Sequence, residues 1–237
     1  MRESVVCLPT YNERENLAGM IDALEPLGVG VLVIDDDSPD GTGELADRLA
    51  AERDWVDVLH RQRKEGLGPA YLAGFRHVLQ GDAKYVLEMD CDFSHAPQDV
   101  PRLIAACANG ADLALGSRYV AGGGTANWSL ARRFVSAGGS LYARAILGVP
   151  TRDLTGGFKC FRREVLEAID LDAVGSKGYA FQIELTYRAL RAGFRVVEVP
   201  ILFSDRTHGA SKMSRAIFLE AVARVPALRL AALTRRL

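Results

Sequence analysis

The sequence predicts an α/β protein with a mostly parallel sheet covered by helices on both faces, and three observations support this class. Short apolar segments alternate along the chain with segments whose apolar residues recur at helical spacing. The short segments are almost continuously apolar, which is typical of strands that are buried on both faces. The 237 residues are 49% hydrophobic and 25% charged, as in a globular protein with a substantial core.

Five strands and three helices are expected in the first half of the chain. The strands are expected at residues 4–10, 29–35, 56–60, 85–90 and 113–117. The helices are marked by Leu17, Met20, Ile21 and Leu24, by Leu72, Phe75 and Leu79, and by Val100, Leu103, Ile104 and Cys107. Ligands of such sheets bind beyond the carboxyl ends of the strands, so the loops after these strands should form one rim.

The pattern is looser in the second half of the chain. The segments expected there are a flexible loop at 121–128, a helix at about 131–147, a turn and strand at 153–161, a helix at 181–192 and an extended segment at 195–203. Because no linker separates two units, residues 1–213 are expected to form a single domain, followed by a helical tail at 214–237.

The pattern of apolar and basic residues in the tail predicts a basic amphipathic helix. Its apolar face holds Ile217, Ala221, Val225 and Leu228, and Pro226 should kink it. The tail contains five arginines and a single acidic residue. Two interpretations stay open, because such a helix can lie on an anionic membrane surface or pack on its own domain.

The net charge of −1 hides a division between the two halves. Residues 1–110 carry 10 Lys/Arg and 20 Asp/Glu, a net of −10, and the remaining residues carry 19 and 10, a net of +9. This division favours a cation on the acidic side and anionic ligands on the basic side, with chance clustering of surface charge as the alternative. Nucleic-acid binding is disfavoured, because the basic half lacks interleaved aromatic residues.

Location is predicted from what the chain does not contain. No apolar run approaches the roughly 20 residues that span a bilayer, and no signal peptide is recognisable at the start. The four cysteines are scattered without a C-x-x-C pattern, which favours a reduced cytoplasmic protein.

Acidic residues follow three of the expected strands. Glu13 follows the first strand, the acidic run 35–37 ends the second, and Asp90 and Asp92 end the fourth. Carboxylates gathered at one rim repel one another unless a cation lies between them. A divalent ion such as Mg²⁺, which joins one or two carboxylates to substrate phosphates, would supply that charge. Asp40, before Gly41, more simply shapes a turn.

Other chemistries of strand ends fit less well. A dinucleotide-binding turn and a P-loop are absent, and the glycines of "EGLGPAYLAG" match only weakly. A phosphatase with an aspartyl nucleophile in D-x-D-x-[TV] is the closest competitor for "DCDFS" (90–94), although its fifth residue would be Ser94. The histidines show no zinc-binding spacing.

Eight segments in this order resemble family 2 glycosyltransferases, most closely the group that makes polyprenyl-phosphate (dolichyl-phosphate) mannose. The segments are "LPTYNERENL", "VIDDDSPDGT", "GLGPAYLAGF", "MDCDFSHAP", "GSRY", "DLTGGFKCF", "SKGYAFQIEL" and "FSDRTHGASKM". The resemblance implies the GT-A fold and inverting transfer of mannose from GDP-mannose to a polyprenyl phosphate, with Mg²⁺ or Mn²⁺. The alternatives are transfer of glucose or another hexose from a UDP- or GDP-sugar and a non-catalytic module that binds nucleotide sugars.

The resemblance also implies roles for individual residues. The expected nucleotide-sugar contacts are Pro9, Tyr11, Glu13, Ile34, Asp36, Asp90, Cys91, Arg206 and Lys212. The expected metal ligands are Asp90, Asp92 and Ser94. Beside Asp92, the expected catalytic residues are Arg118 at the donor phosphates or sugar, and Arg132 and Ser136 at the acceptor phosphate.

A phosphate acceptor removes the need for a general base. A phosphate monoester loses its second proton near pH 6, whereas a hydroxyl must be deprotonated as it attacks. Glu184 lies where relatives that glycosylate hydroxyls have a catalytic carboxylate. A role as a base is the less favoured interpretation here, and placement of its helix or of a loop is the more favoured one. Trp128 is expected to pack or to touch lipid. The resemblance implies a peripheral protein at the cytoplasmic face of a membrane, with or without a separate anchoring protein.

Overall fold

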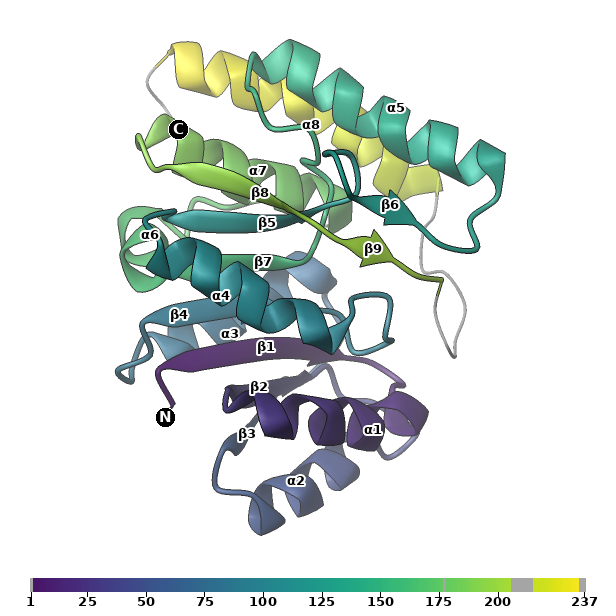
Figure 1. Cartoon of the computed structure of the whole chain (residues 1–237), viewed down its shortest axis with the longest axis vertical. Coiled ribbons are helices and arrows are strands. Elements are labelled where there is room, and N and C mark those ends of the chain that lie inside the picture. The colour runs from purple at the N-terminus through teal and green to yellow at the C-terminus, as the bar shows by residue number, and fades with distance from the viewer. Residues whose placement is uncertain (1, 177, 206–214, 235–237) are drawn as a thin grey trace.

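The computed structural model describes residues 2–176, 178–205 and 215–234, with side chains from residue 222 onward in the last range (Figure 1). The strands are β1 (Ser4–Thr10), β2 (Gly30–Asp35), β3 (Val56–His60), β4 (Tyr85–Glu88), β5 (Leu113–Ser117), β6 (Gly124–Thr125), β7 (Lys159–Arg162), β8 (Val196–Pro200) and β9 (Leu202–Phe203). The α-helices are α1 (Arg14–Leu24), α2 (Thr42–Glu52), α3 (Leu67–Val78), α4 (Val100–Ala108), α5 (Leu130–Leu147), α6 (Arg163–Ala168), α7 (Gly178–Arg191) and α8 (Arg215–Leu233). Short 3₁₀ helices cover Glu25–Leu27 and Pro97–Asp99.

Seven of the described strands form one sheet in the order β3-β2-β1-β4-β7-β5-β8. The pairs are parallel except where β7 runs antiparallel between β4 and β5. The predicted mostly parallel sheet is therefore confirmed. The first strand runs from left to right in Figure 1, so the carboxyl ends of the parallel strands lie on the right of that view.

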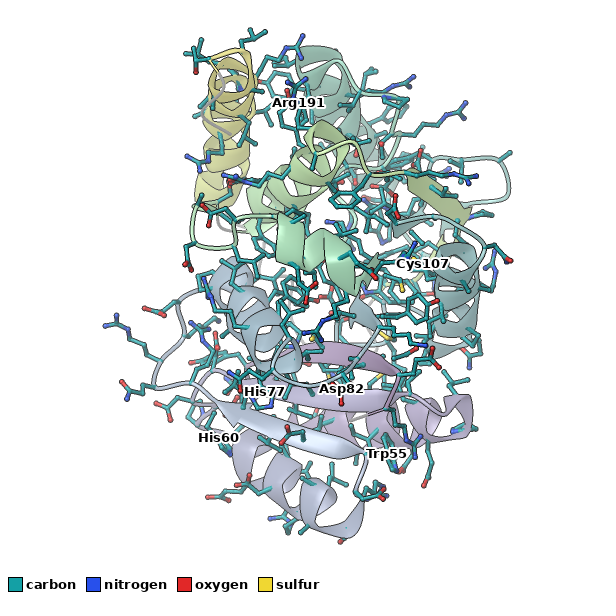
Figure 2. The ribbon with its side chains drawn as sticks, turned by 90° about the vertical axis from the view of Figure 1, so that its left-hand side faces the viewer. Trp55, His60, His77, Asp82, Cys107 and Arg191 are labelled. Carbon is teal, nitrogen blue, oxygen red and sulfur yellow. The ribbon has the colours of Figure 1, made fainter. Side chains whose placement is uncertain are left out.

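Both faces of the sheet are buried, as the continuous apolar strands predict. Val5 and Cys7 of β1 belong to a core cluster shared with α3 and α7. Val6 and Leu8 point the other way into a cluster shared with α1 and α4. Successive strand residues alternate between faces, so an apolar run without alternation buries both. The four cysteines are buried free thiols, and Figure 2 labels Cys107 among the packed side chains.

The fourth strand is shorter than predicted. It ends at Glu88, opposite Lys159 of β7, whereas the sequence predicted a strand to residue 90. The backbone N–H of Asp90 donates to Nδ1 of His95, 3.1 Å away, instead of to a neighbouring strand. The D-x-D segment therefore belongs to the loop beyond the sheet.

The prediction of a flexible loop at 121–128 is wrong for part of this segment. Gly124 and Thr125 form β6, which pairs in parallel with β9. A side chain on Gly123 would place its Cβ 2.4 Å from the carbonyl oxygen of Ser117, so glycine is needed there for close packing. The predicted extended segment at 195–203 is divided at Ile201 between β8 in the large sheet and β9 here.

The C-terminal helix α8 packs on the domain. Val225 and Leu228 are buried in a third apolar cluster with residues of α5 and α7, and α8 lies beside α5 in Figure 1. The helix continues through Pro226. Leu230 and Leu233 are exposed, so the apolar residues of α8 are not confined to the packed face. Packing on the domain, one of the two interpretations of the tail, therefore holds for the described part of α8.

Candidate active site

The candidate nucleoside residues lie where β1 and β2 end side by side. Pro9 pairs with Ile34 across the two strands. Tyr11 follows β1, and Nζ of Lys64 lies 3.8 Å from the centroid of its ring. Glu13 is nearly buried and accepts a hydrogen bond from Asn16 Nδ2 at 2.9 Å. The rim thus brings together residues from both strands, as predicted.

Ile34 and Cys91, both predicted to contact the nucleotide sugar, have side chains that are buried in the core. The side chain of Ile34 is completely buried in the core, and a Cβ on Gly74 of α3 would lie 2.3 Å from its Cδ1. The side chain of Cys91 is likewise buried in the cluster under α1 and α4. Ile34 and Cys91 could therefore contact a nucleotide sugar only through their backbone atoms.

The acidic run after β2 is offset by protein groups. Oδ1 of Asp35 accepts hydrogen bonds from the hydroxyls of Thr10 (3.1 Å) and Ser38 (2.6 Å). Asp36 forms an ion pair with Arg61. Burial raises the pKa of the Asp36 carboxyl, and the adjacent Arg61 opposes that rise. At Asp36 the negative charge is offset by Arg61. A metal ion is therefore not needed at this strand end, in contrast to the expectation for all three.

Arg61 is a rim residue that the sequence did not single out. Besides Asp36 it binds Glu65 at 2.8 Å. A hollow of about 530 Å³ is lined by His60, Arg61, Gln62, Arg63 and Glu65. Arg61 follows β3, the strand beside β2. Its place after a strand end could have marked it, but its partner lies 25 residues away in the sequence.

The D-x-D segment is ordered by its own side chains. Oδ1 of Asp92 accepts from the backbone N–H of Ser94 at 3.0 Å, and both residues are buried. His95 lies under this loop, stacked on Phe158 with ring centroids 4.9 Å apart. Phe93 takes a positive φ of 59°, a conformation costly for a bulky residue. The hydrogen bond within this tight turn holds the two aspartates beyond β4 and offsets the cost of the Phe93 conformation.

These residues fit a metal ion that also binds substrate. In the part of the chain that the structure describes, no three His, Cys, Asp or Glu side chains gather into a ligand cluster. An ion held by protein alone would need such a cluster. A Mg²⁺ or Mn²⁺ ion completed by diphosphate oxygens needs only one or two carboxylates. Asp92, with Asp90 beside it and 31% of the Asp90 side chain exposed, meets that smaller requirement.

Arg118 is held in place by an anion of the protein. It binds Asp153 through two side-chain hydrogen bonds of 2.8 and 2.7 Å, and it also binds the hydroxyl of Thr155. Both partners of the Arg118–Asp153 pair are buried, which fixes the guanidinium. Trp128 and Phe203 lie on other sides of it, with ring centroids 5.7 and 5.4 Å from its Cζ.

The candidate acceptor residues lie on α5. Arg132 forms an ion pair with Asp205 at 2.9 Å. Ser136, one turn further, accepts a hydrogen bond from Tyr119 Oη at 2.7 Å. Tyr119 follows Arg118 directly, so one loop reaches both the buried arginine and the helix. Tyr119 is a second residue that the sequence analysis did not single out.

The remaining predictions have different outcomes. Arg206 and Lys212 lie outside the described residues. Glu184 is completely buried and binds Ser176, Arg188 and Arg224, which agrees with the expectation that it places its helix or a loop. No helix of the described residues has both the length and the apolar character needed to cross a bilayer.

Solved structures with this arrangement are glycosyltransferases. Glucosyl-3-phosphoglycerate synthase from Mycobacterium tuberculosis, in complex with Mn²⁺, UDP and glucosyl-3-phosphoglycerate, gives a TM-score of 0.63 at 21% identity over 99% of this chain and 80% of that one. A mannosyltransferase from Pyrobaculum calidifontis in complex with GDP-Man and Mn²⁺ gives 0.60 at 16% identity, over 98% and 74%. The protein therefore has a GT-A-like fold, the α/β fold of nucleotide-sugar transferases.

The family follows from the sequence comparisons. Residues 5–170 match the family model "Glycosyl transferase family 2", and the chain belongs to this family. It is 52% identical to polyprenol monophosphomannose synthase of Mycolicibacterium smegmatis, over 94% of this chain and 86% of that protein. It is 50% identical to undecaprenyl-phosphate mannosyltransferase of Micrococcus luteus, over 95% and 93%. Dolichol-phosphate mannosyltransferase of Pyrococcus furiosus is 39% identical over 90% of this chain and 59% of that protein.

Proposed function

We propose that this chain transfers mannose from GDP-mannose to the phosphate of a polyprenyl phosphate, with inversion at the anomeric carbon. One chain of contacts carries the proposal, because it connects the donor rim to the acceptor helix. His95 binds the backbone of Asp90, and its ring centroid lies 5.1 Å from that of Phe203. The Phe203 ring lies 5.3 Å from Trp128, whose ring lies 4.1 Å from Cζ of Arg132. A donor at Asp90 and a phosphate at Arg132 would then lie at the two ends of one continuous set of packed side chains.

The comparisons support the choice of substrates. The two relatives of 52% and 50% identity are named for mannose transfer to polyprenol and undecaprenyl phosphates. The structural neighbour in complex with GDP-Man and Mn²⁺ supports the donor and the metal. Transfer of glucose or another hexose from a UDP- or GDP-sugar is the second candidate, because a neighbour of the same fold is complexed with UDP.

A divalent ion at the rim would offset the charge that develops on the departing diphosphate. Asp92 is the residue placed to hold this ion, with Asp90 beside it and Ser94 fixing the carboxylate through its backbone N–H. On the nucleoside side of the rim, Arg61 is paired with Asp36 and Glu65, and Nζ of Lys64 lies over the ring of Tyr11. The positive charge that the diphosphate would meet as it leaves therefore comes mainly from the divalent ion at Asp92.

The acceptor phosphate needs placement rather than deprotonation. Ser136 Oγ accepts a hydrogen bond from Tyr119 Oη, so its own O–H can donate to a phosphate oxygen. Arg132 supplies cationic N–H groups, and Arg118, which the resemblance places at the donor phosphates or sugar, lies against the same Trp128 ring. Attack by a phosphate oxygen on the face opposite the diphosphate inverts the α-linked sugar to a β-linked lipid phosphosugar. No side chain has to act as a base.

The exposed face of α5 suits the surface of a membrane that carries such an acceptor. Leu130, Phe134 and Leu141, spaced to share one face, are 69%, 76% and 63% exposed. Arg133 and Arg144, which are also exposed, flank them. Exposed apolar side chains bordered by arginines are typical of helices that lie on anionic bilayers. Arg132 and Ser136 would then lie at the level of the lipid headgroups.

The decisive assay separates the candidate functions. Labelled GDP-mannose, UDP-glucose or UDP-GlcNAc is incubated with the protein, a polyprenyl phosphate and Mg²⁺, and lipid-soluble label is counted. We expect label from GDP-mannose alone, and loss of transfer with EDTA and with Asp92→Ala. Asp82→Asn, an exposed carboxylate on the face viewed in Figure 2, is the matched control and should keep full activity.

Other results of this assay would contradict the proposal. Label from UDP-glucose would favour the second candidate, and label on a free polyprenol would show that the acceptor is a hydroxyl. A covalent phosphate on Asp90 would indicate a phosphatase. Donor binding without turnover would indicate a binding module.

The membrane contact has a separate test. Phe134→Ser with Leu141→Ser should reduce sedimentation with phosphatidylglycerol vesicles, while transfer to a short, water-soluble prenyl phosphate is kept. If the unmodified protein alone does not sediment with these vesicles, the α5 face is not a membrane anchor and a separate anchoring protein is favoured.

A further inference from the structure

Trp128 contacts both candidate phosphate-binding arginines. It lies between β6 and α5, and its ring centroid is 4.1 Å from Cζ of Arg132 and 5.7 Å from Cζ of Arg118. The two arginines are 14 residues apart in sequence. A single indole therefore links a guanidinium on the loop after β5 to another on α5.

The position of the indole relative to Arg132 is fixed locally. Ser129, which follows Trp128, caps α5 by accepting a hydrogen bond from the backbone N–H of Arg132. On its other side, the ring of Phe203 meets the indole edge-on at 75° with centroids 5.3 Å apart. The helix cap and this aromatic contact leave the indole little freedom to move.

This arrangement suits a ligand with negative charge. The charge of Arg118 is offset by Asp153 and that of Arg132 by Asp205. The negative charge of the ring face adds to the stabilisation of both guanidinium groups. Contact with a ring face does not consume N–H donors, which lie in the guanidinium plane. Arg132 can therefore keep its place on Trp128 while its N–H groups exchange Asp205, its ion-pair partner, for a phosphate.

The indole nitrogen gives a second indication. Nε1 of Trp128 is buried and has no acceptor among the described residues. A buried indole N–H normally finds a partner. This indole N–H and the guanidinium groups of Arg118 and Arg132 are three donors around one side chain, a set that suits an anion.

We propose that Trp128 is a positioning residue for the acceptor, whose ring holds Arg118 and Arg132 at the spacing that binds one phosphate monoester. The proposal rests on the proposed function for the identity of the lipid, but its claim concerns phosphate binding. It differs from the sequence-based expectation, under which Trp128 packs or touches the lipid chain. The ligand class is a prenyl phosphate, recognised at its dianionic head.

The chain allows a direct binding measurement, because it has only two tryptophans. Trp55 lies before β3, on the face viewed in Figure 2, with Arg2 over its ring. In Trp55→Phe, which should keep full activity, Trp128 becomes the single tryptophan, and its emission can be excited apart from that of the seven tyrosines. We expect geranyl phosphate to change its fluorescence saturably and geraniol to leave it unchanged. An equal response to geraniol would overturn the proposal, because it would show contact with the lipid chain.

Variants of Trp128 test the positioning role by calorimetry. Trp128→Leu should weaken binding of geranyl phosphate at least tenfold and leave binding of GDP-mannose unchanged. Trp128→Phe, which keeps a ring, should recover most of that affinity. In turnover, Trp128→Leu should raise the KM for the acceptor much more than it lowers kcat. Unchanged affinity in a folded Trp128→Leu protein would refute the proposal.

Failure of this inference is distinguishable from failure of the proposed function. If the unmodified protein makes lipid-linked mannose and Trp128→Leu binds acceptor normally, only the inference fails. If no donor gives lipid-linked sugar but phosphate binding depends on Trp128, the site stands and the proposed function fails. Affinity for inorganic phosphate alone that Trp128→Leu does not change would mark an adventitious anion site and overturn the inference.

Discussion

Lys159 and Glu88 face each other across β7 and β4 with both side chains completely buried, and Nζ lies 3.7 Å from Oε2. Burial lowers the pKa of Lys159 to about 8 and raises the pKa of Glu88 to about 7, while their attraction opposes both shifts. Nζ of Lys159 also donates to the backbone oxygen of Gln182 at 2.9 Å. This pair ties the base of the D-x-D loop to α7.

Removing one member of the Lys159–Glu88 pair should lower the free energy of unfolding substantially. Lys159→Met leaves a buried carboxylate without its cation and should lower the free energy of unfolding by about 3–5 kcal/mol. The double change Glu88→Gln with Lys159→Met should lose clearly less than Lys159→Met alone. Urea unfolding of the single and double variants measures the coupling. A loss below about 1 kcal/mol in Lys159→Met would show that the pair contributes little.

The hydrogen bond from Tyr119 to Ser136 should act on acceptor binding. Tyr119→Phe removes the donor that orients the Ser136 hydroxyl, and we expect the KM for prenyl phosphate to rise about threefold to tenfold, as for one hydrogen bond. The KM for GDP-mannose should stay the same. Tyr142→Phe is the matched control, because its hydroxyl joins α5 to the backbone of Val222 in α8. Equal effects of both changes would point to a general loosening of α5.

Glu184 should matter for stability and not for chemistry. Glu184→Gln weakens its buried contacts with Arg188 and Arg224 and should lower the free energy of unfolding by about 1.5–3 kcal/mol. We expect kcat to change less than about twofold, because the acceptor needs no base. The comparison variant is Glu167→Gln, an exposed partner of Arg163, which should cost less than about 1 kcal/mol. A hundredfold loss of kcat in folded Glu184→Gln would restore a catalytic role.

The pH dependence of transfer should follow the acceptor. Below about pH 6 the lipid phosphate holds a second proton, so kcat/KM for the acceptor should fall about tenfold per pH unit below that value. Above it the profile should be level, since no enzyme base has to lose a proton. A prenyl phosphonate, whose second pKa is higher, should move the rise to higher pH. A rise that stays at the same pH for both acceptors would belong to the enzyme.

The sequence by itself determined the order of most of the elements and the location of the rim, although it indicated neither β6 nor α6. The strands β1, β3 and β5 have the predicted bounds, because an apolar run bounded by turn residues specifies a strand through local physics. The place of the D-x-D segment at a strand end follows from the same run. The positions of Arg132 and Ser136 on one helix were predictable for the same reason, since four-residue spacing puts them on one face.

Only the tertiary structure decided which charged groups form ion pairs with one another. Asp36 is paired with Arg61, 25 residues away, and Arg118 with Asp153, 35 residues away. Neither pairing has a local signal, because packing of the sheet and its covering helices brings the partners together. The requirement for glycine at position 123 is also tertiary, because it arises only from the close packing of the Ser117 carbonyl oxygen against that position. Periodicity is a property of neighbours in sequence, whereas the partner of a charge is a property of neighbours in space.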